Sequence, residues 1–217
     1  MAAKPYIGMG MEGSIARWYE KNTARDMDEF RRLAARIADK VAAGSRVLEI
    51  APGPGFLAVE LAKRGLAVTG LDISRTFVEL ARRNAEAAGV EIAFEQGNAS
   101  AMPFADHSFD FLVCRAAFKN FADPVGALRE MQRVLKPGGQ GLIIDLRRDT
   151  SMSEISRYVD SLGASLPNRL FTKFVFRTVL LPRAWTEAAF AEMLRQIPFR
   201  RAEIEPNAIG MDIWLEA

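Results

Sequence analysis

The sequence has little of what builds covalent cross-links or metal sites. Its 217 residues contain one cysteine, Cys114, and one histidine, His107. A single cysteine excludes an internal disulfide bond, and the sequence has no paired Cys/His spacing of the zinc-binding kind. We therefore expect no metal, a reducing environment and a cytoplasmic protein.

Long apolar runs and a strong charge imbalance are also missing. Residues 1–13 lack the apolar stretch of a signal peptide or a membrane span. The longest apolar run near the C-terminus, residues 171–181, is interrupted by Lys173 and Arg177. This favours an amphipathic or buried helix and leaves a membrane-surface role as the alternative. A net charge of +2 is too small to indicate a polyanionic partner. We expect no membrane span and no nucleic-acid partner.

The composition is that of an ordinary globular protein, with 49% hydrophobic and 26% charged residues. Apolar residues recur at helical spacing from residue 14 to 43, which predicts one long or two short amphipathic helices. From Arg46 to Leu146, short apolar runs alternate with helical stretches. This alternation predicts a parallel sheet that is covered by helices on both faces.

Helix-capping residues, glycines and prolines set the bounds of the expected helices and strands. The predicted strands are residues 46–50, 66–73, 90–96, 108–114 and 140–146. Ser74 and Asp123 are expected helix caps, and Gly138 is expected to end the helix that begins at Pro124. After Leu146, helical pieces without strands predict an inserted cap. A helix at 186–197 and two strands at 200–205 and 209–216, pairing as an antiparallel hairpin, complete the chain.

A glycine loop follows the first predicted strand, and it is where a ligand is expected. In an open α/β sheet the ligand crevice lies at the carboxyl ends of the strands. Residues 49–55 read EIAPGPG, in which Gly53 and Gly55 permit tight turning beside a ligand. Asp72 ends the second strand, where a carboxylate can accept both hydroxyls of a ribose.

This loop is compatible with two kinds of cofactor. Its glycines and Ala58 also satisfy the dinucleotide fingerprint, with Asp72 near the expected acidic position. However, Pro54 removes a backbone N–H from a loop that would hold pyrophosphate, and Glu49 places a negative charge beside it. A cationic ligand suits Glu49 better. S-adenosylmethionine carries an ammonium and a sulfonium and no phosphate, so the electrostatics favour this methyl donor over a nicotinamide.

With these residues, the chain resembles the class I S-adenosylmethionine-dependent methyltransferases, close to the ubiquinone/menaquinone-type small-molecule group. The resemblance runs from Arg46 to Leu146 through VLEIAPGPG, GLDIS, QGNASAMPF, FDFLVCRAAFKNFADP and RVLKPGG, in that order. It implies cofactor contacts along the strand ends. Asp72 would hold the ribose of the cofactor. The residues that would contact its methionine part are Glu49, Ala51, Gly53 and Gly55, and those that would contact its adenine are Ile73, Asn98 and Ala99.

The resemblance also implies the fold. We expect a Rossmann-like α/β architecture: a doubly wound, mostly parallel, seven-stranded sheet with a C-terminal antiparallel hairpin, an N-terminal helical lid and a helical cap after the fifth strand. The expected single domain comprises the lid (1–44), the cofactor-binding core (45–146), the cap (147–185) and the final helix with the edge hairpin (186–217).

The chain departs from the family pattern at the loops. Ala51 stands where the first glycine is usual, and Asn98 stands where an aspartate is usual and can still accept through its amide oxygen. Many relatives have a histidine pair before the F-x-D-P segment, where this chain has Lys119 and Asn120. His107 lies in the turn ADHSFD, for which we expect a solvent-exposed role.

The acceptor is expected at the crevice mouth, against Trp18, Phe118, Lys119 and Asn120. Methyl transfer is an in-line displacement, so positioning can supply much of the acceleration. Lys119 could act as a base only with a depressed pKa; otherwise it pairs with a carboxylate or phosphate, or is solvated.

Two further side chains have divided interpretations. Arg115 is, with Lys119, a candidate catalytic residue: it contacts the cofactor or holds an acidic substrate, or it pairs with a helix carboxylate. Tyr19 is the better candidate than its neighbour for contacting the cofactor from the lid, because its hydroxyl can reach polar groups.

The cap combines positive charge with apolar side chains. Residues 147–183 contain seven Lys/Arg and three Asp/Glu, which favours a substrate with an anionic portion. Apolar residues such as Phe171, Phe174, Phe176 and Leu180 suit an apolar pocket, a homodimer contact or plain core packing.

The predicted function is transfer of a methyl group from S-adenosylmethionine to O, N, S or C of a small molecule, which leaves S-adenosylhomocysteine. Three alternatives remain. A nucleic-acid methyltransferase lacks support because CRAAF stands where an N-P-P-Y-like motif would follow the fourth strand. A nicotinamide-dependent oxidoreductase is disfavoured by Pro54 and Glu49. A non-catalytic module that binds the cofactor is compatible with the missing histidine pair.

Overall fold

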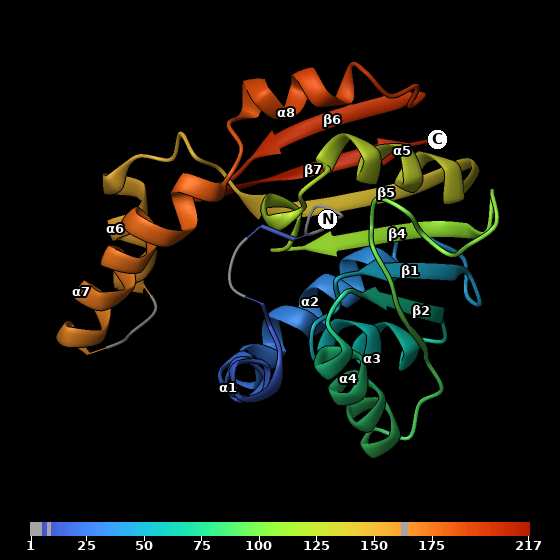
Figure 1. Cartoon of the computed structure of the whole chain (residues 1–217), viewed down its shortest axis with the longest axis horizontal. Coiled ribbons are helices and arrows are strands. Elements are labelled where there is room, and N and C mark those ends of the chain that lie inside the picture. The colour runs from blue at the N-terminus through green and yellow to red at the C-terminus, as the bar shows by residue number, and fades with distance from the viewer. Residues whose placement is uncertain (1–5, 8–9, 162–164) are drawn as a thin grey trace, which may run out of the picture.

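The computed structural model describes residues 6–7, 10–161 and 165–217 (Figure 1). The N-terminal helical region forms two α-helices, α1 (Gly13–Thr23) and α2 (Met27–Ala38), joined by the 3₁₀ turn η1 (Ala24–Asp26). Of the two possibilities for this region, the two-helix form is therefore correct. Helix α2 buries Phe30, Leu33 and Ile37 against the sheet side of the fold, which is the apolar stripe that the spacing predicted.

Within the described residues, seven strands form a single sheet in the order β3-β2-β1-β4-β5-β7-β6. Their bounds are β1 (Arg46–Ile50), β2 (Ala67–Asp72), β3 (Ala93–Gln96), β4 (Phe109–Arg115), β5 (Leu135–Leu146), β6 (Arg201–Pro206) and β7 (Gly210–Glu216). The first five pair in parallel, whereas β7 pairs antiparallel with both β5 and β6. The predicted fold class is confirmed, with β7 inserted between β5 and the edge strand β6.

Helices cover both faces of this sheet. The bounds are α3 (Phe56–Ala62), α4 (Arg75–Ala87), α5 (Pro124–Val134) and α8 (Glu187–Leu194). Helices α2, α3 and α4 bury one apolar cluster against the sheet, and α5 and α8 bury a second cluster against the opposite face (Figure 1). The predicted caps are present: the Ser74 and Asp123 side chains accept from the N–H groups of Phe77 and Gly126.

Helix α5 ends earlier than predicted. It stops at Val134 rather than near Gly138, and Leu135 already pairs with β4. Pro137 has no N–H and disfavours helical backbone at the preceding residue, so the helix cannot continue through it. Residues 136–139 instead form an irregularity in the pairing of β5 with β4, where the register shifts between Phe109 and Phe111.

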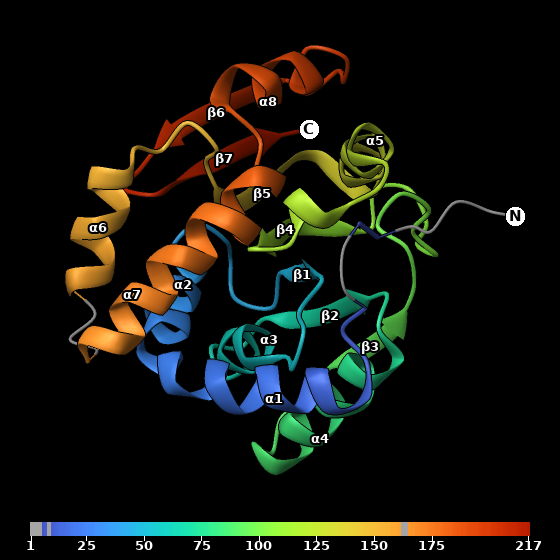
Figure 2. The ribbon, with the colours of Figure 1, turned by 60° about the vertical axis from the view of Figure 1, so that its left-hand side comes forward.

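The cap after β5 is helical, as predicted. It contains α6 (Met152–Ser161), α7 (Leu166–Val175), the π-helical turn η3 (Phe176–Leu180) and the 3₁₀ turn η4 (Leu181–Arg183). Its own small core consists of Ile155, Val159, Phe176 and Leu181. Figures 1 and 2 show α6 and α7 as an arm beside the sheet, away from α5. None of the described helices combines the length and the apolar character needed to cross a bilayer.

The strand order reverses between β1 and β4, which are neighbours in the sheet although β2 and β3 lie between them in the chain. At such a point the loops after the two strands diverge to opposite faces and leave a crevice. The functional site should therefore lie at the carboxyl ends of β1 and β4.

Candidate functional site

A cavity of about 1070 Å³ lies at these carboxyl ends. Its walls come from the N-terminal segment with α1 and α2, from the loops after β1, β2 and β3, from the segment after β4, and from the cap. Ligand pockets generally measure about 300–1,000 Å³. This cavity is therefore large enough to hold a second small molecule beside a first.

The loop after β1 forms the floor of the cavity through strained backbone. Ala51 and Gly53 have φ of 56° and 57° and line the cavity, and the Ala51 N–H donates to the Leu71 carbonyl at 2.7 Å. Gly55 has φ of 78° but faces helix α4 instead, where a Cβ would lie 2.8 Å from the Ala81 Cβ. Gly55 thus permits close helix packing and does not line the cavity.

Replacing Ala51 by glycine should stabilise the protein by about 1 kcal/mol. The left-handed backbone conformation costs alanine about 1–2 kcal/mol and glycine almost nothing, and the larger conformational entropy that glycine loses on folding offsets part of this gain. Urea unfolding measures the change. The matched control is Ala99→Gly, since Ala99 also lines the cavity but its φ is not positive; this variant should lose stability. If Ala51→Gly also loses stability, the strain argument is wrong.

Asp72 stands at the end of β2 with 5% of its surface exposed. Its two oxygens accept from the N–H of Gly53 at 3.0 Å and of Ser74 at 2.8 Å. Burial raises the pKa of Asp72 to about 6, although these backbone donors act in the opposite direction. Each carboxylate oxygen can accept a further hydrogen bond. The residue therefore has the acceptors that two ribose hydroxyls require.

Glu49 stands at the end of β1 and is 4% exposed. Within the described chain, its Oε2 atom has no hydrogen-bond partner. Burial raises the pKa of the Glu49 carboxyl to about 8, opposed by the Arg115 guanidinium. Burying a carboxyl without a hydrogen-bond partner costs folding free energy unless a ligand supplies that partner. An ammonium group fits this position because it favours the ionised form of Glu49, whereas a phosphate would disfavour that ionisation and would be repelled by the Asp72 carboxylate.

The free protein should become less stable relative to Glu49→Gln as the pH rises from about 5 to 8. The pKa of Glu49 is about 8 in the folded chain against an ordinary value of 4.5, so the folded state binds its proton more tightly than the unfolded state. Stability from such a group falls with rising pH across this window and is constant above it. Glutamine does not titrate, so the Glu49→Gln variant does not lose stability in this way.

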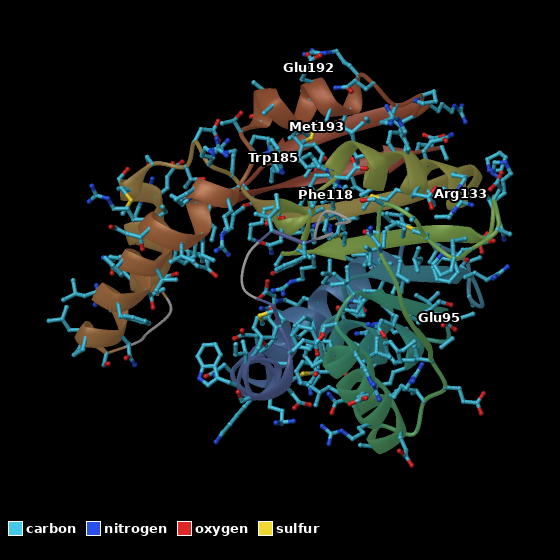
Figure 3. All side chains as sticks on the ribbon, in the orientation of Figure 1. Glu95, Phe118, Arg133, Trp185, Glu192 and Met193 are labelled. Carbon is cyan, nitrogen blue, oxygen red and sulfur yellow. The ribbon has the colours of Figure 1, made fainter. Side chains whose placement is uncertain are left out.

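Chemical denaturation at several pH values measures this difference. The control is Glu95→Gln, an exposed position on β3 (Figure 3), which should follow the wild type at every pH. A constant difference between Glu49→Gln and the wild type from pH 5 to 8 would contradict the assignment.

Lys119 belongs to the turn η2 (Phe118–Asn120) after β4 and lines the cavity. It is 8% exposed, and its Nζ donates to Asp145 Oδ1 at 2.8 Å. Asp145, at the end of β5, also accepts from the backbone N–H groups of Lys119 and Leu146, each at 2.8 Å. Of the interpretations given for Lys119, the structure shows the carboxylate-paired one.

Arg115 ends β4 and lines the cavity beside helix α2. Its Nη2 lies 2.7 Å from Glu29 Oε1, and its guanidinium lies 4.8 Å from the centre of the Phe30 ring. The helix-carboxylate interpretation of Arg115 is therefore what the structure shows. The same guanidinium raises the local positive potential near Glu49.

Five more of the predicted residues line the cavity: Tyr19, Ile73, Asn98, Ala99 and Asn120. The Tyr19 ring packs edge-on against Phe77 with centroids 5.7 Å apart. Asn98 Oδ1 accepts from the Ser100 N–H at 3.0 Å and retains a second acceptor position. The structure thus brings most of the predicted donor-site residues together around one cavity.

Two predicted acceptor residues lie elsewhere. Trp18 is 66% exposed on α1, since consecutive residues of a helix point about 100° apart and its neighbour Tyr19 takes the inward position. Phe118 is fully buried between Phe121 and Phe190, on the side of the sheet that α8 covers (Figure 3). Neither residue lines the cavity.

Sequence reasoning missed several cavity residues that come from distant parts of the chain. Tyr6 lines the cavity because the Ile7 N–H donates to the Asn120 carbonyl at 2.8 Å and holds the N-terminal segment there. Burial raises the pKa of Tyr6, while the Arg183 charge acts in the opposite direction. Tyr158 of α6 and Arg183 of η4 also line the cavity. Only Asp145, an acid at a strand end, had a local sequence signal.

No cluster of three or more His, Cys, Asp or Glu side chains able to hold a metal occurs in the part of the chain that the structure describes. The site offers buried carboxyls, an ion pair and apolar walls. Such a site binds and orients organic ligands with positive charge on one side.

Comparisons with known proteins agree with this geometry. A methyltransferase domain family matches residues 48–143. Demethylmenaquinone methyltransferase of Chlorobaculum parvum is 34% identical over 196 residues, which cover 85% of this chain and 79% of the relative. The enzyme of that name from Thermus thermophilus is 42% identical over 105 residues, 48% of each chain.

Solved structures show the same fold. A Methanococcus maripaludis protein, described as an S-adenosyl-L-methionine-dependent methyltransferase, aligns with a TM-score of 0.75 at 21% identity, over 99% of this chain and 96% of that one. The family implies S-adenosylmethionine as methyl donor and a small molecule as acceptor, and Glu49 and Asp72 fit that donor. The chain therefore belongs to the class I S-adenosylmethionine-dependent methyltransferases, in their ubiquinone/menaquinone-type group.

Proposed function

We propose that the chain methylates the ring of a reduced quinone or a similar apolar aromatic hydroxyl compound. Two observations support this proposal. Relatives that include the Chlorobaculum parvum protein bear the name demethylmenaquinone methyltransferase. The cavity also has a polar half at the strand ends and an apolar half under the cap. The single observation that carries the proposal is that both halves belong to one cavity.

The polar half is the proposed donor site. Asp72 would hold the ribose hydroxyls, and the unpartnered Oε2 of Glu49 would hold the ammonium group. Ile73, Asn98 and Ala99 would contact adenine. When bound, S-adenosylmethionine supplies an electrophilic methyl group on a positively charged sulfur.

The apolar half is the proposed acceptor site. Phe176 and Leu180 of η3, Tyr158 of α6 and Ile209 before β7 line this side and also belong to the cap's own apolar cluster. Flat aromatic and aliphatic walls suit a ring with an apolar substituent. These residues would exclude water and align the nucleophilic ring atom with the methyl group, so that proximity and orientation supply the acceleration.

Lys119 is proposed as an electrostatic group and not as a base. Its ammonium donates to Asp145 and to the Ala116 carbonyl, which leaves one N–H. That proton can stabilise the oxyanion of a ring hydroxyl that has given its proton to solvent, which makes the ring more nucleophilic. The C–CH₃ bond would then form as the S–CH₃ bond breaks and leaves S-adenosylhomocysteine, and the methylated ring carbon would lose its proton to solvent to restore the aromatic ring. Fixed donors of this kind act strongly where water is excluded.

The test is transfer from methyl-labelled S-adenosylmethionine to a reduced naphthoquinone that carries a short prenyl tail, with transfer RNA and a tail-free catechol as comparison acceptors. We expect label in the naphthoquinol, much less in the catechol and none in the RNA. The matched enzyme controls are Asp72→Ala, which should lose transfer, and Glu95→Gln, which should keep it. Label in RNA, or in no acceptor while the donor still binds, would refute the proposal.

A further inference from the structure

Helix α7 presents an apolar face that nothing in the described chain covers. Leu166, Leu170, Phe171 and Phe174 are each 61–67% exposed, and none of the ten residues of α7 is buried. Leu166, Leu170 and Phe174 recur every four residues and Phe171 adjoins them, so the four side chains share one face of the helix. Exposed apolar side chains gathered in this way mark interaction surfaces.

Positive charge accompanies this face. Lys173 and Arg177 lie three and seven residues after Leu170, so they stand at its margin. Lys173 and Arg169 share a single carboxylate, that of Asp160. Arg177 is exposed, and within the described residues no carboxylate pairs with it. The margin of the apolar face is therefore net positive.

The same asymmetry holds for the cap as a whole. Residues 147–183 carry seven Lys/Arg and three Asp/Glu, in a chain whose net charge is only +2. A helix with leucines and phenylalanines on one face and basic residues at its margin has the composition of helices that lie in the interface of a lipid bilayer. Anionic lipid headgroups attract such basic margins.

The helix that carries the apolar face also leads to the site, although its cavity-lining side chains point to another side. Helix α7 passes into η3 without a break, because Val175 and Phe176 both have right-handed helical backbone. Phe176 and Leu180 of η3 line the cavity. Figures 1 and 2 show the arm of α6 and α7 projecting beside the sheet.

From these observations we propose that the outer face of α7 docks on the surface of an anionic lipid bilayer. The four apolar side chains enter the region between headgroups and acyl chains, and the basic margin meets the headgroups. A second copy of this chain suits the face less well, because a two-fold contact would place one positive margin against the other. The docking does not depend on the identity of the methyl acceptor.

Sedimentation of the full chain with lipid vesicles tests this proposal without any donor or acceptor. One set of vesicles contains phosphatidylcholine alone, and the other contains phosphatidylcholine with phosphatidylglycerol. The wild type should bind the anionic vesicles at least tenfold more tightly than the neutral ones, and high ionic strength should weaken this binding. Equal binding to both sets, or binding to neither, would overturn the proposal.

Variants locate the surface. The combined replacement Leu170→Ser, Phe171→Ser and Phe174→Ser should reduce vesicle binding at least tenfold; because all three side chains are exposed, the variant should unfold at the wild-type temperature. Arg177→Gln should weaken binding, whereas Arg129→Gln, an exposed arginine on the distant α5, should not.

Two results would reject α7 as the docking surface. One is full vesicle binding by the folded triple variant. The other is a wild-type dimer, measured by analytical ultracentrifugation, that the triple variant converts to a monomer, because a second copy would then occupy the face. Loss of methyl transfer with unchanged vesicle binding would contradict the proposed acceptor and leave the docking intact.

Discussion

The variant Asp72→Ala is expected to bind S-adenosylhomocysteine at least 100-fold more weakly than the wild type and to remain folded. A hydrogen bond to a charged group contributes about 1.5–3 kcal/mol, and Asp72 would make one to each ribose hydroxyl. Since about 1.4 kcal/mol corresponds to a factor of ten, loss of both bonds gives a factor of 100 or more. Calorimetric titration measures the affinity.

The stability of this variant should change little. The alanine leaves the N–H groups of Gly53 and Ser74 without their acceptor, but it also removes a buried carboxyl whose pKa burial raises to about 6. The affinity of Asp72→Asn for S-adenosylhomocysteine should lie between those of the wild type and Asp72→Ala, because asparagine keeps one acceptor oxygen. Asp106→Ala, an exposed aspartate outside the cavity, is the control that should bind normally. Unchanged affinity in Asp72→Ala would refute the ribose assignment.

The variant Lys119→Met is expected to lose about 3–5 kcal/mol of stability. It leaves Asp145, which is 6% exposed, without its cation, and breaking a buried pair on one side carries a penalty of this size. Adding Asp145→Asn should restore part of the loss, because the neutral amide needs no cation. The restoration is partial because the backbone N–H groups of Lys119 and Leu146 donate to different oxygens of Asp145, and the single amide oxygen can accept from only one of them. Thermal or urea unfolding of the single and double variants measures both effects.

The double variant also separates a structural role for Lys119 from an electrostatic one. If Lys119 stabilises the oxyanion of the acceptor, the folded double variant should have a much lower kcat than the wild type, with little change in its affinity for the donor. The loss in kcat should shrink as the pH rises through the pKa of the acceptor hydroxyl, since the oxyanion then forms without help. Full activity in the double variant would show that Lys119 only holds the fold together.

The parts of the fold that were predictable from the sequence are those set by local physics. The apolar runs marked the strands, and Ser74 and Asp123 marked helix starts because their side chains satisfy free N–H groups. The proximity of Glu49 and Asp72 was predictable for the same reason, since they stand near the ends of two adjacent strands. Helix α5 was predicted too long because the glycines after Pro137 resembled a helix end, while the proline itself had already stopped the helix.

The remainder of the site depends on tertiary packing. The pair of Lys119 and Asp145 joins residues 26 positions apart, and it forms because β4 and β5 are neighbours in the sheet. Tyr6 reaches the cavity through backbone pairing of the N-terminal segment with Asn120 and Phe121, which no periodicity encodes. The sequence favoured Tyr19 over Trp18 only through its hydroxyl, whereas the packing of α1 on α4 is what turns Tyr19 inward and Trp18 outward.

The fold alone does not assign the reaction, because one fold supports many unrelated activities. Here the proposed donor site depends on Glu49 and Asp72, and the proposed acceptor site depends on the apolar half of the cavity.

Titration of the wild-type chain with S-adenosylhomocysteine and, separately, with NAD decides which cofactor the strand ends bind. We expect tight binding of S-adenosylhomocysteine at neutral pH, accompanied by proton release, because burial raises the pKa of Glu49 to about 8 in the free protein and an ammonium partner would lower it. We expect no measurable binding of NAD. Tight binding of NAD without binding of S-adenosylhomocysteine would contradict the assignment of Glu49 and Asp72 to a sulfonium donor.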